Sequence, residues 1–306
     1  MRRKVSVIGS GAVGATLAQR VAESGLADVV LVDILGKVAC GKAYDMLDAS
    51  AVIPHECDIL GTDDYSKIAS SDIIVVTAGL ARKPGMTRED LVVKNAEIVK
   101  AVCAHIKTYS PNAIVIMVTN PLDVMTYLAN KITGIDRKRV FGMAGVLDAS
   151  RLVYLIAKEA NVPRSSVETF VMGSHGDTMV PIISKTKIAG KPISGILSKD
   201  KIEAIVKRTC DRGAEIVSLL GTGSAYYSPS AAVFKMIKAI FEDSKEMLVA
   251  SSVLCGEYGL SGVAIGVPCI LGKNGIEKVV EMDISENEMD SFQKSAKAIR
   301  SSIDIL

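Results

Sequence analysis

The first half of the chain alternates short apolar runs, rich in β-branched residues, with longer stretches of helical periodicity. The apolar runs cover residues 5–8, 29–32, 73–77 and 114–118, and the clearest helical stretches cover residues 14–24 and 89–109. Each predicted strand is apolar nearly throughout, which is typical of a sheet that helices cover on both faces. The alternation therefore predicts an α/β domain with a doubly wound parallel sheet and right-handed crossovers.

The second half loses this regular alternation. Helical patterns cover residues 150–160, 199–220, 229–241 and 286–303, and strands are expected near residues 169–172, 187–189, 248–255 and 264–270. Such an order favours an α+β domain. We expect two domains, residues 1–145 and residues 146–306, with a cleft between them.

Positive and negative charges are nearly balanced, with 36 Lys and Arg against 34 Asp and Glu and a net charge of +2. Clustered basic residues would mark a nucleic-acid-binding protein, so we expect no nucleic-acid partner. No apolar run reaches the roughly 18 residues that span a bilayer, and Gly9 and Gly11 interrupt the segment after the basic N-terminus. We therefore expect a cytoplasmic protein with no membrane partner.

The six cysteines are scattered along the chain without any C-x-x-C pair. This spacing argues against a zinc site and against a redox dithiol, and we expect no metal. Buried, chemically inert side chains are the simpler interpretation.

The first predicted strand leads into Gly9-Ser10-Gly11-Ala12-Val13-Gly14 and then a helix. In this context the pattern is typical of a Rossmann dinucleotide site, where the glycines allow a tight turn, approach of a pyrophosphate and close helix packing. Asp33 ends the second strand, where its carboxylate would accept ribose hydroxyls and repel a 2′-phosphate, so NAD is favoured over NADP. The alternative is a tight turn and a strand-ending acid with no ligand.

Further residues follow the third and fourth strands, at the carboxyl edge of the sheet where ligands of such folds bind. The predicted cofactor-binding residues are Gly9, Gly11, Ala12, Val13, Gly14, Asp33, Thr77, Ala78, Gly79, Asn95, Val118 and Asn120.

His175 is the histidine with the clearest signature of catalysis among the three in the chain, because it lies in Gly173-Ser174-His175-Gly176-Asp177. Imidazole suits proton transfer near neutral pH, whereas His55 and His105 are expected to be structural. Asp148 and Arg151 are three residues apart and lie on one face of a helix. The alternative for this pair is a surface ion pair.

Together these residues resemble the lactate/malate dehydrogenase family over essentially the whole chain. The resemblance rests on five motifs in order: residues 9–14, residues 78–88, Asn120-Pro121, residues 148–151 and residues 173–177. It implies that His175 exchanges the substrate proton while Asp148 orients the imidazole and stabilises its charged form. Arg151 would bind the C1 carboxylate bidentately, and Asn120 and Arg88 would contact the reacting oxygen.

Arg82 is the expected determinant of substrate choice. In the malate enzymes of this family an arginine at this place pairs with the second carboxylate, and the run from Arg82 to Arg88 resembles that version. The resemblance therefore implies malate and oxaloacetate as substrates, with L-lactate dehydrogenase as the alternative. The loop 80–89 resembles a mobile lid, or else an ordinary solvated turn.

Two points stay open at this stage. A catalytically silent NAD-binding protein is the alternative from another functional class, and the intact set of predicted site residues argues against it. Residues 221–227, where the pocket wall is expected, do not match the family cleanly, so roles for Thr222, Ser224 and Ala225 in the pocket are not assigned. We expect a homotetramer or homodimer, with residues 40–52 as one contact.

Overall fold

The computed structural model describes residues 2–80 and 86–306, apart from the side chain of Arg88. Six strands form a parallel sheet in the order β3-β2-β1-β4-β5-β6. They are β1 (Lys4–Ile8), β2 (Asp28–Val32), β3 (Ile59–Thr62), β4 (Ile73–Val76), β5 (Ile114–Met117) and β6 (Val140–Met143). The central strands β4, β5 and β6 are buried along their whole length, which explains why their sequences are apolar at every position.

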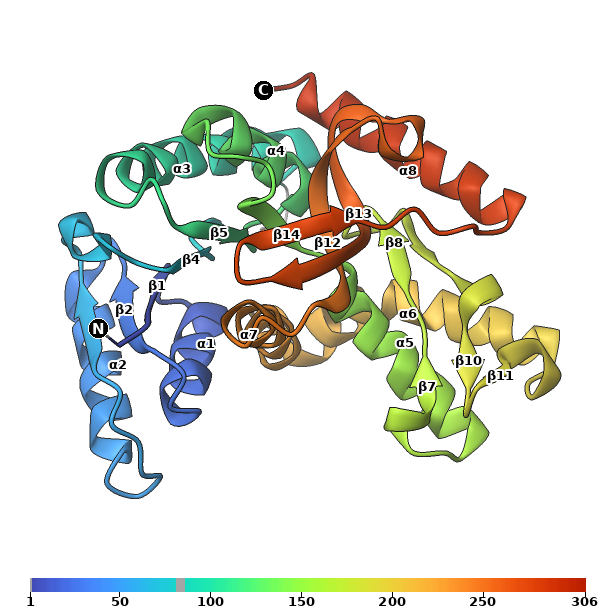
Figure 1. Ribbon diagram of the computed structural model, residues 1–306, viewed down its shortest axis with the longest axis horizontal. Helices are drawn as coiled ribbons and strands as arrows, with labels where there is room; N and C mark the ends of the chain where they lie inside the picture. The colour runs from blue at the N-terminus through green and yellow to red at the C-terminus, as the bar shows by residue number, and fades with distance from the viewer. Residues whose placement is uncertain (1, 81–85) are drawn as a thin grey trace.

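Helices cover both faces of this parallel sheet (Figure 1). On one face lie α1 (Ala12–Glu23), α2 (Gly36–Ala49) and α7 (Tyr227–Phe241), and on the other lie α3 (Arg88–Tyr109) and α4 (Leu122–Thr133). Helix α7 comes from the second half of the chain and packs against α1. The predicted doubly wound fold is confirmed.

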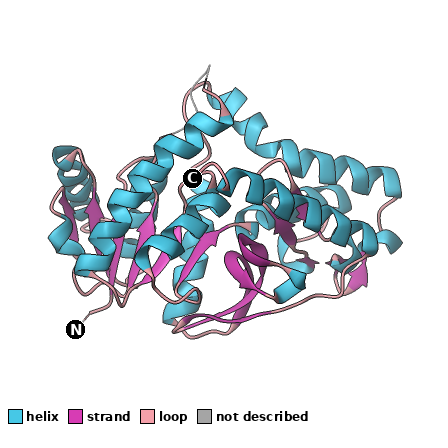
Figure 2. Cartoon of the chain, turned by 90° about the horizontal axis from the view of Figure 1, so that it is seen from above, coloured by secondary structure: helices cyan, strands magenta, loops and turns pink. Residues whose placement is uncertain are grey.

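The sheet continues into the second half of the chain, because β12 pairs antiparallel with β6. The added strands are β12 (Glu246–Cys255), β13 (Ser261–Gly272), β8 (Val171–Gly173), β9 (Met179–Pro181) and β14 (Gly275–Val279). A smaller sheet contains β7 (Val167–Glu168), β10 (Lys187–Ile188) and β11 (Lys191–Pro192). The helices here are α5 (Gly145–Ala160), α6 (Lys199–Leu220) and α8 (Glu286–Ile303). Seen from above, helices of both halves lie along the strands (Figure 2).

Most predicted elements lie within a few residues of their observed positions, but helix α5 begins at Gly145 instead of near residue 150. Its N-cap, Ala144, has no side chain that could cap the helix, so the sequence carries no start signal there. The prediction also omitted the helices α2 and α4 and the strands β3, β6, β9, β11 and β14. Two of these, α4 and β6, carry or adjoin residues of the site.

No helix in the described part of the chain is long and apolar enough to cross a membrane. Among the cysteines, Cys57, Cys103 and Cys269 are buried as expected, and burial raises the pKa of Cys103 and Cys269 to about 12. Cys255 is exposed, so the expectation of buried cysteines is wrong for this residue.

Candidate active site

The turn between β1 and α1 is held by glycines at two points. Gly9 has φ +107°, and a Cβ there would lie 2.6 Å from the Thr77 hydroxyl oxygen. A Cβ on Gly14 would lie 1.9 Å from the Gly9 carbonyl oxygen, so only glycine allows the helix to pack this close. At Gly11 a Cβ would meet nothing within 4 Å, and the space beside it is open. The N-terminus of α1 faces this space, which fits the phosphates of a dinucleotide.

Asp33 directly follows β2 and its carboxylate is held by backbone donors. The N–H of Ser10 donates to Oδ2 at 2.6 Å, and the N–H of Leu35 donates to Oδ1 at 3.0 Å. Burial alone would raise the pKa of Asp33, but these hydrogen bonds outweigh it and hold the pKa below its usual range. The side chain is therefore a fixed negative charge beside the glycine turn. Lys42 donates to the carbonyl of Ser10 from the other side.

Asn95 lies beneath the edge of the site. Its side chain is fully buried, accepts from the Leu80 N–H at 2.8 Å, and donates to the carbonyls of Leu80 and Asn120 at 3.1 and 2.6 Å. The amide therefore holds two loop segments in place. Asn120, by contrast, is exposed at the cavity wall.

A cavity of about 720 Å³ joins the glycine turn to His175. The predicted site residues that line it are Gly11, Ala12, Val13, Gly14, Thr77, Gly79, Val118, Asn120, Arg151 and His175. Gly9, Asp33, Ala78, Asn95 and Asp148 do not line this cavity and lie behind or beside it. His55 and His105 do not line it either, and His105 stacks on Tyr65 at 4.0 Å between ring centres.

The far wall of the cavity includes Thr222, Ser224 and Ala225 of the segment 221–227, where the pocket wall was expected although the role of each residue was left open. Val217 and Leu220 of α6 also line it and were not predicted. The signal that could have revealed these two residues is their apolar character at the end of an amphipathic helix. In the structure Val217 and Leu220 are exposed there and not packed in the core.

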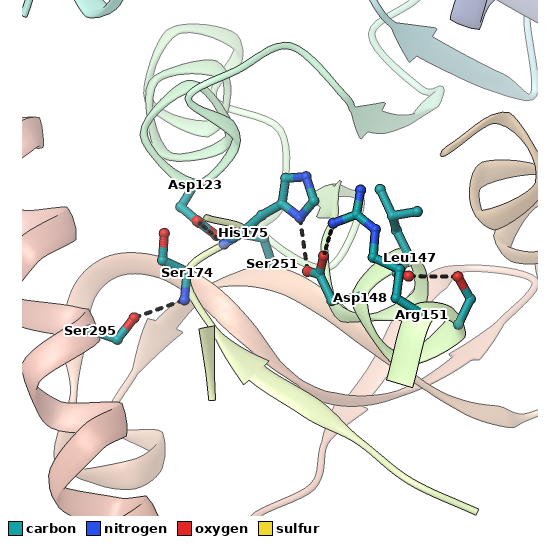
Figure 3. A network of polar contacts seen from close by, with 9 residues as sticks. Asp123, Leu147, Asp148, Arg151, Ser174, His175, Ser251 and Ser295 are labelled. Atoms are coloured by element: carbon teal, nitrogen blue, oxygen red, sulfur yellow. Dashed lines mark hydrogen bonds and ion pairs between the residues drawn. The ribbon is translucent and has the colours of Figure 1, made fainter. Parts of the chain in front are cut away.

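His175 lines the cavity and forms a close pair with Asp148 (Figure 3). The Nδ1 atom of His175 lies 2.8 Å from Oδ2 of Asp148, and the Asp148 side chain is only 2% exposed. Burial alone would lower the pKa of His175, but the negative charge of Asp148 and the hydrogen bond to it raise the pKa above its usual value. Because Nδ1 is engaged, Nε2 is the ring nitrogen left for proton exchange.

Arg151 lies beside this pair, with Nη1 3.3 Å from Oδ1 of Asp148. Its side chain is 11% exposed, and burial lowers its pKa. The Nε atom is buried and has no hydrogen-bond acceptor among the described residues. Since a buried cation is normally paired, this guanidinium has donors left for an anion in the cavity.

The backbone of His175 is held by a residue that the sequence did not single out. Oδ2 of Asp123 accepts the His175 N–H at 2.9 Å, and Oδ1 accepts the hydroxyl of Ser251 at 2.7 Å (Figure 3). Asp123 lies in the first turn of α4, where an acid is expected merely as a helix-start signal.

Two predicted arginines fall at the edge of the described structure. Arg82 lies outside the described residues, and Arg88 is the first residue of α3, with a side chain outside the description. A capping box fixes this helix start: Thr87 Oγ1 accepts from the Asp90 N–H at 3.0 Å and Asp90 accepts from the Thr87 N–H at 3.1 Å.

Comparison with known proteins identifies the fold and the family of the chain. Residues 3–142 match the model of the lactate/malate dehydrogenase NAD binding domain, and residues 145–305 match that of the α/β C-terminal domain of the same family. The chain belongs to the lactate/malate dehydrogenase family. The resemblance predicted from the five motifs is thereby confirmed, as are an enzyme of this family and NAD as its cofactor.

Relatives match this dehydrogenase chain over almost its full length. Malate dehydrogenase of Chlorobium limicola is 51% identical over 304 residues, which cover 99% of this chain and 98% of the relative. The crystal structure of Cryptosporidium parvum malate dehydrogenase has a TM-score of 0.96 at 41% identity and covers 99% of this chain and 98% of its own. C. parvum lactate dehydrogenase, complexed with lactic acid and NAD, has a TM-score of 0.97 at 38% identity, covering 100% and 98%.

Proposed function

We propose that this dehydrogenase interconverts malate and oxaloacetate with NAD and NADH. The observation that carries the proposal is the His175–Asp148 pair beside Arg151, which lines the cavity that extends from the glycine turn and has an unpaired buried Nε. The names of the most similar relatives support malate as the substrate, and so does Arg82 in the sequence.

The residues of the first half fit the cofactor. The N-terminus of α1 and the open side of Gly11 would bind the pyrophosphate, and Asp33 would accept the adenosine ribose hydroxyls. Thr77, Gly79 and Val118 would form the wall toward the reacting end. Bound NAD supplies the hydride acceptor for malate oxidation and, as NADH, the donor for the reverse reaction.

His175 would take the proton of the C2 hydroxyl on Nε2 when malate is oxidised, and return it when oxaloacetate is reduced. Asp148 is then a positioning residue, because it holds Nδ1 and stabilises the imidazolium that forms.

The proposed substrate contacts surround this histidine. Arg151 would bind the C1 carboxylate with its free donors, and Asn120 would hydrogen-bond the reacting oxygen. Arg88, at the start of α3, would polarise the carbonyl, and Arg82 would pair with the second carboxylate.

Association into a homodimer or homotetramer is part of the proposal. Helix α2 exposes Val38 and Tyr44, and Ile34, Leu35 and Val52 beside it are also exposed, as a contact surface would require. The cytoplasmic location and the division into domains at residue 145 stay predictions from the sequence.

The substrate proposal is tested by NADH oxidation with oxaloacetate and with pyruvate, in wild type and Arg82→Gln. Loss of one partner of a desolvated ion pair costs about 3–5 kcal/mol, and about 1.4 kcal/mol is tenfold. We therefore expect wild type to prefer oxaloacetate, and Arg82→Gln to lower kcat/KM for oxaloacetate by about two to three orders of magnitude while raising it for pyruvate.

Lys83→Gln is the matched control, since it removes the adjacent cation of the same segment and should leave the ratio of the two substrates unchanged. A wild type that prefers pyruvate would establish the lactate dehydrogenase alternative instead.

A further inference from the structure

The backbone of His175 is tied to a buried carboxylate from the other half of the chain. Asp123, in the first turn of α4, is 3% exposed and accepts the His175 N–H at 2.9 Å. Its other oxygen accepts the hydroxyl of Ser251, which is fully buried on β12. Ser251 pairs with Gly142 of β6, so Asp123 lies where the sheet passes from one half of the chain to the other. The positioning role of Asp148 at Nδ1 does not account for this second carboxylate.

We propose that Asp123 is a second carboxylate partner of His175, which fixes the histidine backbone relative to Asn120 and adds negative charge that favours the imidazolium. The inference rests on the proposed function in so far as His175 exchanges the substrate proton. Asp123 touches only the backbone of His175, and we therefore assign it as a positioning residue.

The hydrogen bond to Asp123 links His175 to the segment that carries Asn120. Asn120 lies at the cavity wall three residues before Asp123, at the chain segment that enters α4. The hydrogen bond from His175 to Asp123 therefore joins the two segments that would lie on either side of the reacting oxygen. Asp148 holds the ring of the same histidine at Nδ1 from α5. Backbone and ring are thus fixed separately, by carboxylates on two different helices (Figure 3).

The N–H groups of Ser174 and His175 are neighbours but have different kinds of acceptor. The N–H of Ser174, one residue earlier, donates at 2.8 Å to the hydroxyl of Ser295 on α8. A neutral hydroxyl is therefore sufficient to hold this loop. At His175 the acceptor is instead a buried carboxylate, whose charge is costly to bury. A carboxylate in place of a hydroxyl is explained if its negative charge stabilises the imidazolium of His175.

The charges around His175 agree with this explanation. Asp148 and Arg151 face it from α5 and Asp123 from α4, while Arg212 of α6 lies beyond Arg151. Burial lowers the pKa of His175, Asp148 and then Asp123 raise it, and Arg151 opposes them. Burial holds the pKa of Asp123 above its usual value, and the donors Ser251 and His175 N–H, which favour the charged form, offset this only in part. The N-terminus of α4 favours that charge as well.

The test is the titration of His175 in Asp123→Asn. An asparagine keeps the shape and can still accept the His175 N–H, but it removes the charge. The chain has three histidines, so the ring signals of protein labelled with ¹³C-histidine are assigned by replacing His55 and His105 in turn. The expected result is a titration midpoint of His175 at lower pH than in wild type. Asp148→Asn should move it in the same direction.

Ser295→Ala is the matched control, because it releases the adjacent N–H without removing a charge, and it should leave the midpoint unchanged. A folded Asp123→Asn protein with the wild-type midpoint would overturn the proposal. If Asp123→Asn does not fold, Ser251→Ala replaces it. That variant removes a donor that favours the charged form of Asp123, so a smaller shift in the same direction is expected, and no shift overturns the proposal.

The pH dependence of oxaloacetate reduction separates this inference from the proposed function. Reduction needs protonated His175, so in Asp123→Asn the rate should fall at lower pH than in wild type. If the histidine titration shifts and the rate profile does not, the Asp123 partnership stands and His175 is not the proton-transfer group. If neither the histidine titration nor the rate profile responds to Asp123→Asn while both respond to Asp148→Asn, the proposed function stands. The role of Asp123 as a second carboxylate partner is then refuted.

Discussion

The nucleotide end of the site consists of the turn 9–14 at the cavity and of Asp33 beside it, and both come from one stretch of the chain. The reaction end around His175 is instead assembled from distant segments. In the first, backbone groups fix one another: Gly14 packs on the Gly9 carbonyl, and Asp33 accepts the Ser10 N–H. In the second, His175 depends on Asp148 of α5 and on a buried acid of α4. The nucleotide end is therefore specified locally, whereas the reaction end forms only when both halves of the chain are in place.

The largest expected effect falls on the reaction end alone. His175→Asn should lower kcat for oxaloacetate reduction by about 10²–10⁴-fold, the usual contribution of general acid–base catalysis. NADH binding, measured by fluorescence titration, should change little because the glycine turn and Asp33 do not depend on this side chain. His55→Asn, outside the cavity, should keep the wild-type kcat. A His175→Asn protein that retained most of its kcat would refute the assigned role.

The same contrast explains what the sequence revealed. The glycine turn was predictable because its three glycines, the preceding strand and Asp33 are close in sequence and each has a local physical reason. Asp148 and Arg151 were found by spacing within one helix and His175 by its flanking glycines, but only the fold brings them to 2.8–3.3 Å.

Long-range contacts account for what was missed. Asp123, the acid of α4 that holds His175, has the local sequence context of an ordinary helix-start residue. Its partners lie 52 and 128 residues away in the chain. Val217 and Leu220 of α6 likewise join the far wall only because α6 packs beside α5, whereas the wall at residues 222–225 was expected from the sequence without a role for each residue. Helix α5 begins without a capping side chain, so its start was placed too late.

A smaller effect is expected when the charge beside the imidazole is removed. The Asp148 charge raises the pKa of His175, so oxaloacetate reduction, which needs protonated His175, persists to higher pH and is lost as pH rises through that pKa. Malate oxidation needs neutral His175, so its rate increases as the pH rises through the same pKa. Asp148→Asn should shift both profiles to lower pH. Breaking this buried pair should also lower kcat/KM about a hundredfold, for a cost of about 3 kcal/mol.

The control for that shift is Glu159→Gln, which neutralises a half-exposed acid at the far end of the same helix. Its pH–rate profiles should coincide with those of wild type. Profiles of Asp148→Asn that also coincide with wild type would show that the pair does not set the protonation of the catalytic histidine.

The smallest effect should come from the nucleotide end. Asp33→Ser removes a carboxylate that hydrogen bonds keep charged, and hydrogen bonds to charged groups contribute about 1.5–3 kcal/mol. NADH should therefore bind about tenfold more weakly, while NADPH binding improves because its 2′-phosphate no longer meets a like charge.

Lys42, which donates to Ser10 beside this position, would then be a cation within the ribose site and should strengthen the gain in NADPH binding. Dissociation constants for both cofactors and kcat at saturation are the measurements, with Glu97→Gln, an exposed acid on α3, as the control. Because the reaction end is built independently, kcat with saturating NADH should stay within about twofold of wild type. A large fall in kcat would mean that the two ends are coupled, and near-equal use of NADH and NADPH by the wild type would remove Asp33 as the discriminating residue.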